Sequence, residues 1–203
     1  MMRFLLLSLF ITIGLNAGEV TLSAFIGKVT ADNGLVLGEK LQIDKTYSVG
    51  PNSKIQLLLN NTGVITISQN SLFSIKMIGD DSITFFFKQG VYKIINLANQ
   101  KHRVSLLIET PNLIMDMTNT IALIKITPTT LKAACATSFF TIDHEGKTVT
   151  AKKNEMLVME NGSLKKEPVN YDDFHAVINR KQNVDLDKIH KESNREDPTD
   201  LEN

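Results

Sequence analysis

An alternation of apolar and polar side chains with a period of two residues runs through most of this chain, from Val20 to about Leu164. Ile55, Leu57 and Leu59, for example, would share one face of a strand. Turn-forming Gly, Asn, Asp and Pro residues interrupt the pattern at intervals of roughly ten residues. The helical period is absent over this region, so the pattern predicts an all-β domain of many short antiparallel strands.

The alternation and its turn signals give approximate strand positions. Gln89-Gly90 is expected to be a turn between two separate strands, and Pro111 separates two long apolar stretches. The expected strands are Val20–Ile26, Ile55–Leu59, Val64–Ser68, Ser71–Ile78, Ser82–Lys88, Val91–Ile95, Val104–Glu109, Leu113–Pro128, Thr137–Ile142, Lys147–Ala151 and Met156–Glu160.

Two apolar runs depart from the alternation. A strand that is apolar on both faces is either covered from both sides or offers one face to a partner. Core packing is the simpler explanation of both runs, and the alternative is a surface for another molecule. The residues of this candidate partner surface are Phe85, Phe86, Phe87, Leu123 and Ile124.

The first residues, Met1 to Ala17, have the layout of a secretory signal peptide. Arg3 is followed by an apolar run of about twelve residues, shorter than the ~20 that span a bilayer, and then by the small residue Ala17. We expect cleavage after Ala17 and a periplasmic or secreted protein without a transmembrane span. The alternative is a leader that is retained as an anchor.

The composition and the scattered reactive residues argue against several function classes. The formal net charge is +0 with both signs interleaved, so no basic stripe for nucleic acid is expected. Cys135 is alone, and the four histidines lack the spacing of a zinc site. Asp116 lies inside an apolar strand and is expected on its exposed face. We expect no enzyme, no cofactor and no metal.

The composition changes at Pro168, after which the chain is charged and poor in large apolar residues. The spacing of four apolar residues predicts a short amphipathic helix. Docking of this helix on its own domain is slightly favoured over docking in a partner's groove. The rest of segment 169–203 is expected to be a disordered acidic tail. The apolar face of the predicted helix consists of Tyr171, Phe174, Val177 and Ile178.

Three stretches of the β region combine glycine turns with strands: Gly27-Lys28-Val29 with Leu41 to Asp44, Ser48 to Leu57 continuing through Thr62 to Ile67 and Asn70 to Phe73, and Gln89 to Ile95. Together they resemble the FecR-like domain, a periplasmic β module. The resemblance implies a domain over residues 18–168, built as a sandwich or a solenoid-like stack of strands. The chain lacks the anti-sigma segment and the Arg-Gly-Thr signature of many members, so their signalling role is not carried over.

These observations predict an exported, non-enzymatic binding module of the bacterial cell envelope. Its partner would be an envelope protein, or a glycan or another extracytoplasmic ligand. The alternative is a lipid-handling or envelope-assembly β-module of the jelly-roll or β-taco type, in which the two apolar runs would face an acyl chain.

Overall fold

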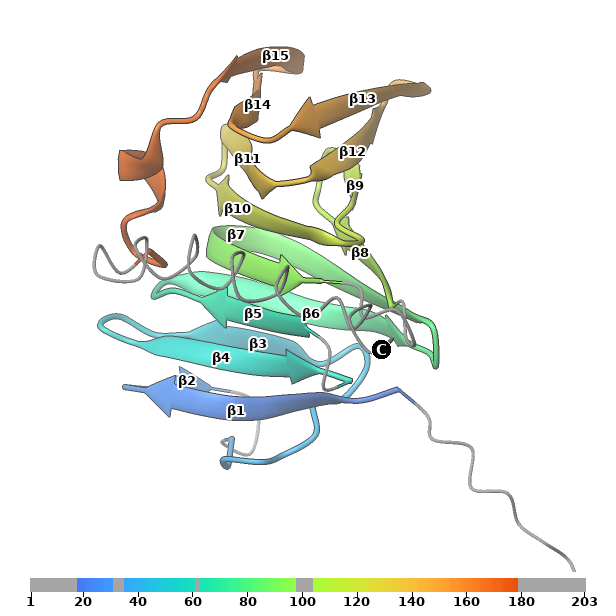
Figure 1. The fold of residues 1–203 in the computed structure, drawn as a ribbon. Helices are drawn as coiled ribbons and strands as arrows, with labels where there is room; N and C mark the ends of the chain where they lie inside the picture. Colours follow the sequence, from blue (N-terminus) through green and yellow to red (C-terminus); the bar gives the residue numbers. More distant parts are fainter. Residues whose placement is uncertain (1–17, 31–34, 61–62, 98–103, 179–203) are drawn as a thin grey trace, which may run out of the picture.

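The computed structural model describes residues 18–30, 35–60, 63–97 and 104–178, and within them it forms fifteen β-strands and one 3-10 turn (Figure 1). The prediction of an all-β fold is confirmed. The elements are β1 Val20–Ile26, β2 Val29–Thr30, β3 Thr46–Val49, β4 Lys54–Leu59, β5 Gly63–Ile67, β6 Ser71–Ile78, β7 Ser82–Asn96, β8 Ser105–Glu109, β9 Ile114–Asp116, β10 Thr120–Ile126, β11 Thr130–Thr137, β12 Phe139–His144, β13 Lys147–Lys152, β14 Glu155–Glu160, β15 Ser163–Pro168 and η1 Tyr171–Phe174.

The strands form two layers that share β7. The first layer, sheet A, has the order β1-β4-β5-β7-β10-β11-β14-β15. The second, sheet B, has the order β2-β3-β6-β7-β8-β9-β12-β13. Figure 1 shows both as one stack that rises from β1 and β2 to β13 and β15. Among the fifteen described strands, the pairings are antiparallel except that of β7 with β8, which is parallel. An isolated bridge between Ile43 and Ile75 is also parallel.

Strand β7 passes from one layer to the other at Gly90. Its first part, up to Gln89, pairs with β6 and β8 in sheet B, and its second part, from Gly90, pairs with β5 and β10 in sheet A. The predicted turn at Gln89-Gly90 is therefore wrong, because the chain bends there without leaving the strand. The φ of +127° at Gly90 permits this bend and is open mainly to glycine.

At this bend, the residues of β7 that face the core change from odd-numbered to even-numbered positions. Phe85 and Phe87 point inward on the sheet B side, whereas Tyr92 and Ile94 point inward on the sheet A side. Phe87 and Tyr92 consequently stack face to face, with ring centroids 3.8 Å apart and planes within 4° of each other. The Tyr92 hydroxyl lies 3.0 Å from the carbonyl oxygen of Leu72, to which it can donate a hydrogen bond.

The core between the layers contains a ladder of aromatic side chains. Tyr47, Phe73, Phe85, Phe87 and Tyr92 follow one another with centroid separations of 5.3, 6.4, 5.7 and 3.8 Å. Each is at most 1 % exposed. Such rings gain energy from burial and from tilted or offset contacts, so the ladder joins β3, β6 and both parts of β7.

The two layers are connected along different edges in the two halves of the stack. Up to β7, the chain crosses between layers at the edge that holds Gly90, through residues 27–28, 50–53 and 68–70. After β7 it crosses at the opposite edge, as at 117–119 and 153–154. The Gly90 edge of the second half therefore carries hairpin turns that belong to one layer each. Among the described residues, no segment crosses between the layers at that edge.

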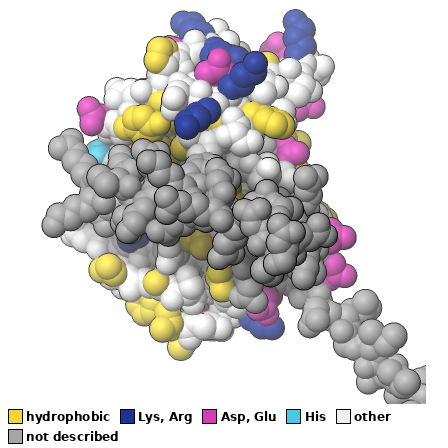
Figure 2. All heavy atoms as spheres, in the orientation of Figure 1, with side chains coloured by type: hydrophobic (Ala, Val, Ile, Leu, Met, Phe, Trp, Pro, Cys, Tyr) yellow, Lys and Arg dark blue, Asp and Glu magenta, His cyan; other side chains and the backbone are white. Residues whose placement is uncertain are grey.

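The two ends of the stack differ in character. At the lower end, Phe25 and Ile26 of β1 are 43 % and 72 % exposed, and Figure 2 shows hydrophobic side chains at this end. At the upper end, β15 exposes Lys165, Lys166 and Glu167, and Figure 2 shows Lys and Arg side chains gathered there. Charged residues on an edge strand oppose pairing with further strands.

The remaining differences from the predicted strands have local causes. The apolar stretch 113–128 forms β9 in sheet B and β10 in sheet A, because the chain turns at Asn119, whose φ is +55°. The alternation does not predict strands β2, β3, β11 and β15. In β11 the small residues of Ala133 to Ala136 weaken the apolar signal that a strand normally gives.

Candidate functional site

The phenylalanines of the candidate partner surface lie on both faces of β7. Phe85 and Phe87 are 0 % exposed and belong to the aromatic ladder. Phe86 points to the other side and lies under the Lys76 ammonium group, which is 5.9 Å from its ring centroid. The run is thus explained by core packing on one face and a cation–π contact on the other.

The second apolar run also lies in the interior. Ile124 faces the core between the layers, and Leu123 lies on the outer face of sheet A, where it is 3 % exposed. Together with the buried phenylalanines this means that the five residues of the candidate partner surface do not form a common exposed surface. What covers Leu123 is a segment of the same chain.

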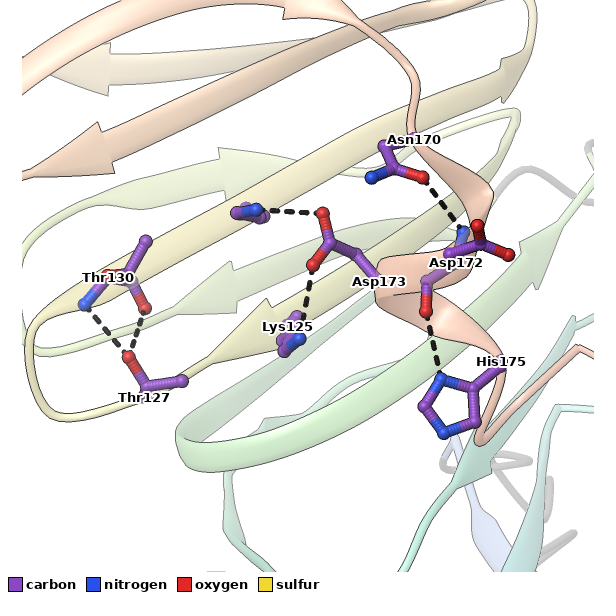
Figure 3. A network of polar contacts seen from close by, with 8 residues as sticks. Lys125, Thr127, Thr130, Asn170, Asp172, Asp173 and His175 are labelled. Carbon is purple, nitrogen blue, oxygen red and sulfur yellow. Dashed lines mark hydrogen bonds and ion pairs between the residues drawn. The ribbon is translucent and has the colours of Figure 1, made fainter.

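We call this segment, residues 169–178, the C-terminal clasp. Its Tyr171–Phe174 part is a single 3-10 turn, shorter than the helix that the spacing predicts. The Asn170 side chain caps it by accepting a hydrogen bond from the Asp172 backbone nitrogen at 3.1 Å (Figure 3). Beyond this turn, the Val177 nitrogen donates a hydrogen bond to the Phe174 carbonyl at 3.0 Å, and both side chains lie buried against the same cluster of residues.

The apolar side of the clasp docks on its own domain. Phe174 and Val177 are 0 % and 3 % exposed, Ile178 is half-buried, and Tyr171 is 43 % exposed. Two of the four predicted face residues are thus fully covered. The residues beneath them are Leu123 of β10, Ala134 of β11, and Met156 and Val158 of β14.

The charged side of the clasp places one carboxylate between two lysines. Lys125 and Lys132 face each other as direct cross-strand partners, an arrangement that is unfavourable for like charges. The Asp173 carboxylate lies between them, 3.2 Å from Lys125 Nζ and 2.7 Å from Lys132 Nζ (Figure 3). The hydrogen bond from Lys132 and, after it, that from Lys125 lower the pKa of Asp173 below its ordinary value, against the opposing effect of desolvation.

Replacing Asp173 by asparagine is expected to loosen the clasp by about 1–2 kcal/mol, because it removes two charge-assisted contacts and leaves two lysines facing each other. Such a change corresponds to roughly five- to thirty-fold faster exchange of the Val177 and Ile178 amide hydrogens, whose nitrogens donate to the Phe174 carbonyl. Hydrogen exchange measured by NMR tests this. Asp80→Asn, an exposed carboxylate on the β6–β7 turn, is the control and should leave both rates unchanged.

The same interaction gives the clasp a pH dependence. The pKa of Asp173 is lower in the folded protein than its ordinary value of 3.8. The stabilisation is therefore complete above the ordinary pKa and is lost as the pH falls through the lowered pKa of the folded protein. The difference in exchange between the native chain and Asp173→Asn should disappear at the acid end of this range.

A second candidate site lies on the Gly90 edge of the upper half, where the described part of the chain makes no connection between the layers. A hollow of about 240 Å³ opens between the β8–β9 turn and the β10–β11 turn. A broader one of about 500 Å³ continues toward the β12–β13 and β14–β15 turns, and both are lined by Asn112 and Pro128. We call the two hollows together the edge groove. Its other polar lining residues include Lys88, Gln89, Thr129, His144, Glu145 and Asn161.

Threonine side chains hold the two central turns of the edge groove in place. Thr110 Oγ1 accepts hydrogen bonds from the backbone nitrogens of Asn112 and Leu113, at 3.4 and 3.2 Å. Thr127 Oγ1 accepts in the same way from the Thr130 nitrogen at 3.0 Å (Figure 3). The lining side chains are thus displayed from turns of defined shape and can offer hydrogen bonds to a polar ligand. No alternation or motif in the sequence identifies them.

Two other residues considered from the sequence have structural explanations. Asp116 is half-buried, and its Oδ1 accepts a hydrogen bond from the Thr118 nitrogen at 2.9 Å, which shapes the turn into β10. Cys135 is 0 % exposed, and burial raises the pKa of its thiol, which donates to the Thr137 carbonyl at 3.2 Å. Within the described ranges, no group of three or more His, Cys, Asp or Glu residues is placed to hold a metal ion.

Several predictions concern residues that the structure does not describe. The signal peptide over residues 1–17 and the tail beyond Ile178 lie outside the described ranges. In the part of the chain that is described, no helix has the length and apolar character to cross a membrane.

Comparison with known proteins gives a likeness at the level of the fold. No family model matches the sequence, and no curated protein matches it. Two crystal structures, at 1.65 and 2.50 Å resolution, of a proposed anti-sigma factor from Parabacteroides distasonis ATCC 8503 are similar to this chain. Each matches with a TM-score of 0.54 and 12% sequence identity over 62% of this chain and 60% of the neighbour. The likeness supports the type of fold that the FecR-like resemblance implies.

Proposed function

We propose that this chain is a FecR-like binding module of the bacterial cell envelope, exported by residues 1–17, and that the edge groove is its ligand site. It would act without catalysis, by holding an envelope protein segment or a glycan. The observation that carries this proposal is the unconnected edge of the upper half, where turns from both layers surround one polar groove.

The construction of the edge groove supports a binding role. Binding residues are commonly carried on loops that a rigid scaffold positions, and here the scaffold is the stacked sandwich with its buried core. The lining combines hydrogen-bonding groups such as Asn112, Gln89 and Asn161 with the apolar surfaces of Pro111 and Pro128. This combination suits an extended polar ligand such as a peptide or a saccharide.

The composition of the interior favours this function over lipid handling. In a lipid-handling module of the jelly-roll or β-taco type, the space between the layers would receive an acyl chain. Here the aromatic ladder occupies that space, and the rings of Phe85 and Phe87 are 0 % exposed. A ligand would therefore lie in the polar edge groove rather than between the sheets.

Filling the edge groove is expected to abolish binding. In the Asn112→Trp chain, the indole should block the point that both hollows share, and we expect at least a fivefold drop in partner recovered by cross-linking and affinity purification from envelope fractions. Gln56→Trp, an exposed position on β4 away from the groove, is the matched control and should retain binding. Circular dichroism melting curves establish that both variants are folded. Equal recovery with folded Asn112→Trp would exclude the groove as the binding site.

A further inference from the structure

We propose that the outer face of sheet A beneath the C-terminal clasp is a peptide-binding site, and that the clasp is the chain's own occupant of it. The peptides it fits carry a carboxylate directly followed by an aromatic residue, with an aliphatic residue three positions later. This proposal is independent of the edge groove. We call the surface the outer-face site; it consists of Leu123, Lys125, Lys132, Ala134, Met156 and Val158.

The outer-face site is built from two adjacent rows of cross-strand partners. In the first row, Leu123 pairs with Ala134 and Ala134 pairs with Met156, so a small side chain lies between two large ones. This row leaves room for an inserted side chain, and Phe174 of the clasp is buried completely against it. An aromatic ring is the side chain that gains most from such a place.

The second row supplies the charge that selects the ligand. Lys125 pairs with Lys132, which in turn pairs with Val158 of β14. Two facing ammonium groups that are only partly exposed, at 33% and 29% of their side-chain areas, favour a carboxylate between them. In the clasp this carboxylate belongs to Asp173, the residue immediately before Phe174. Aromatic and acidic groups must therefore be adjacent in the ligand.

The clasp is built so that another segment can replace it. Its regular part, Tyr171–Phe174, is one short 3-10 turn, which has little helical stability of its own. It is held to the domain mainly by the burial of Phe174 and Val177 and by the two ion pairs of Asp173. Because it is tethered, it competes at a high effective concentration, and a separate peptide gains access when the clasp is weakened or the peptide is abundant.

The test uses the full chain with Asp173→Asn and Phe174→Ala, which weakens the clasp and leaves the outer-face site intact. A fluorescent peptide with the sequence of residues 169–178 is titrated, and its anisotropy is recorded. We expect binding at least tenfold tighter to this variant than to the native chain. A control peptide with the same two substitutions should bind at least tenfold more weakly than the native peptide. Equal binding of both peptides, or no binding to the folded variant, would overturn the proposal.

Two further measurements test the role of Lys132 and cover the case in which the doubly substituted chain does not fold. Lys132→Glu in the doubly substituted chain should reduce binding of the native peptide, and a peptide with lysine in place of its Asp173 should recover part of the loss. If the doubly substituted chain does not fold, the native chain is examined with excess peptide by hydrogen exchange. Displacement of the clasp should then accelerate exchange of the Val177 and Ile178 amides, and unchanged rates up to millimolar peptide would contradict the proposal.

Discussion

Replacing Phe87 by alanine is expected to destabilise the protein by about 3–5 kcal/mol, a large part of the free energy of unfolding of an ordinary domain. The Phe87 ring is 0 % exposed and stacks on Tyr92 at 3.8 Å and against Phe85 at 5.7 Å. Its loss removes the buried area and leaves a cavity at the bend, where the layers share one strand.

Urea unfolding followed by far-ultraviolet circular dichroism measures this effect as a shift of the midpoint. The matched control is Phe86→Ala, the neighbouring residue of the same strand, whose ring is half-buried on the other side under Lys76. It should cost about 1 kcal/mol, because a cation–π contact at the surface and a partial burial are lost. Similar costs for the two variants would mean that the ladder is not the centre of the core.

This pair of residues shows what the alternation can predict and what it cannot. It places Phe85 and Phe87 on one face of a strand and Phe86 on the other, and it identifies most strands, since the period of two is a local property. It does not reveal that β7 continues through Gly90, that β7 pairs in parallel with β8, or that two layers form. These features depend on pairing between distant segments.

The candidate sites, like the fold, are only partly predictable from the sequence. The spacing of Tyr171, Phe174, Val177 and Ile178 identifies the residues of the clasp, but its conformation is a 3-10 turn and its partner lies on β10, β11 and β14. The importance of Lys125 and Lys132 follows only from their cross-strand register. The edge groove is still harder to predict, because its lining comes from several turns that the fold brings to one edge.

Replacing Gly90 by alanine is the second change that should be strongly destabilising, with an expected cost of about 3 kcal/mol or more. The φ of +127° is strained for any residue with a side chain. In addition, a Cβ at this position would lie 2.8 Å from the Cα of Ser71, which is backbone and cannot rotate away. Ser71 begins β6, which pairs with the first part of β7 next to the bend. Relief therefore requires β6 and β7 to move apart at the bend.

The two causes can be separated by matched variants in thermal and urea unfolding. Gly146→Ala places a side chain at a milder positive φ of +71°, in the left-handed region, and a Cβ there would meet no atom within 4 Å, so it should cost only about 1–2 kcal/mol. Ser71→Gly combined with Gly90→Ala removes the Ser71 side chain but not its Cα, so it should recover only part of the loss. If Gly90→Ala were no more costly than Gly146→Ala, close packing at the bend would not be needed to join the layers. A greater cost that Ser71→Gly partly recovers would show that the fold requires close packing of Gly90 against β6.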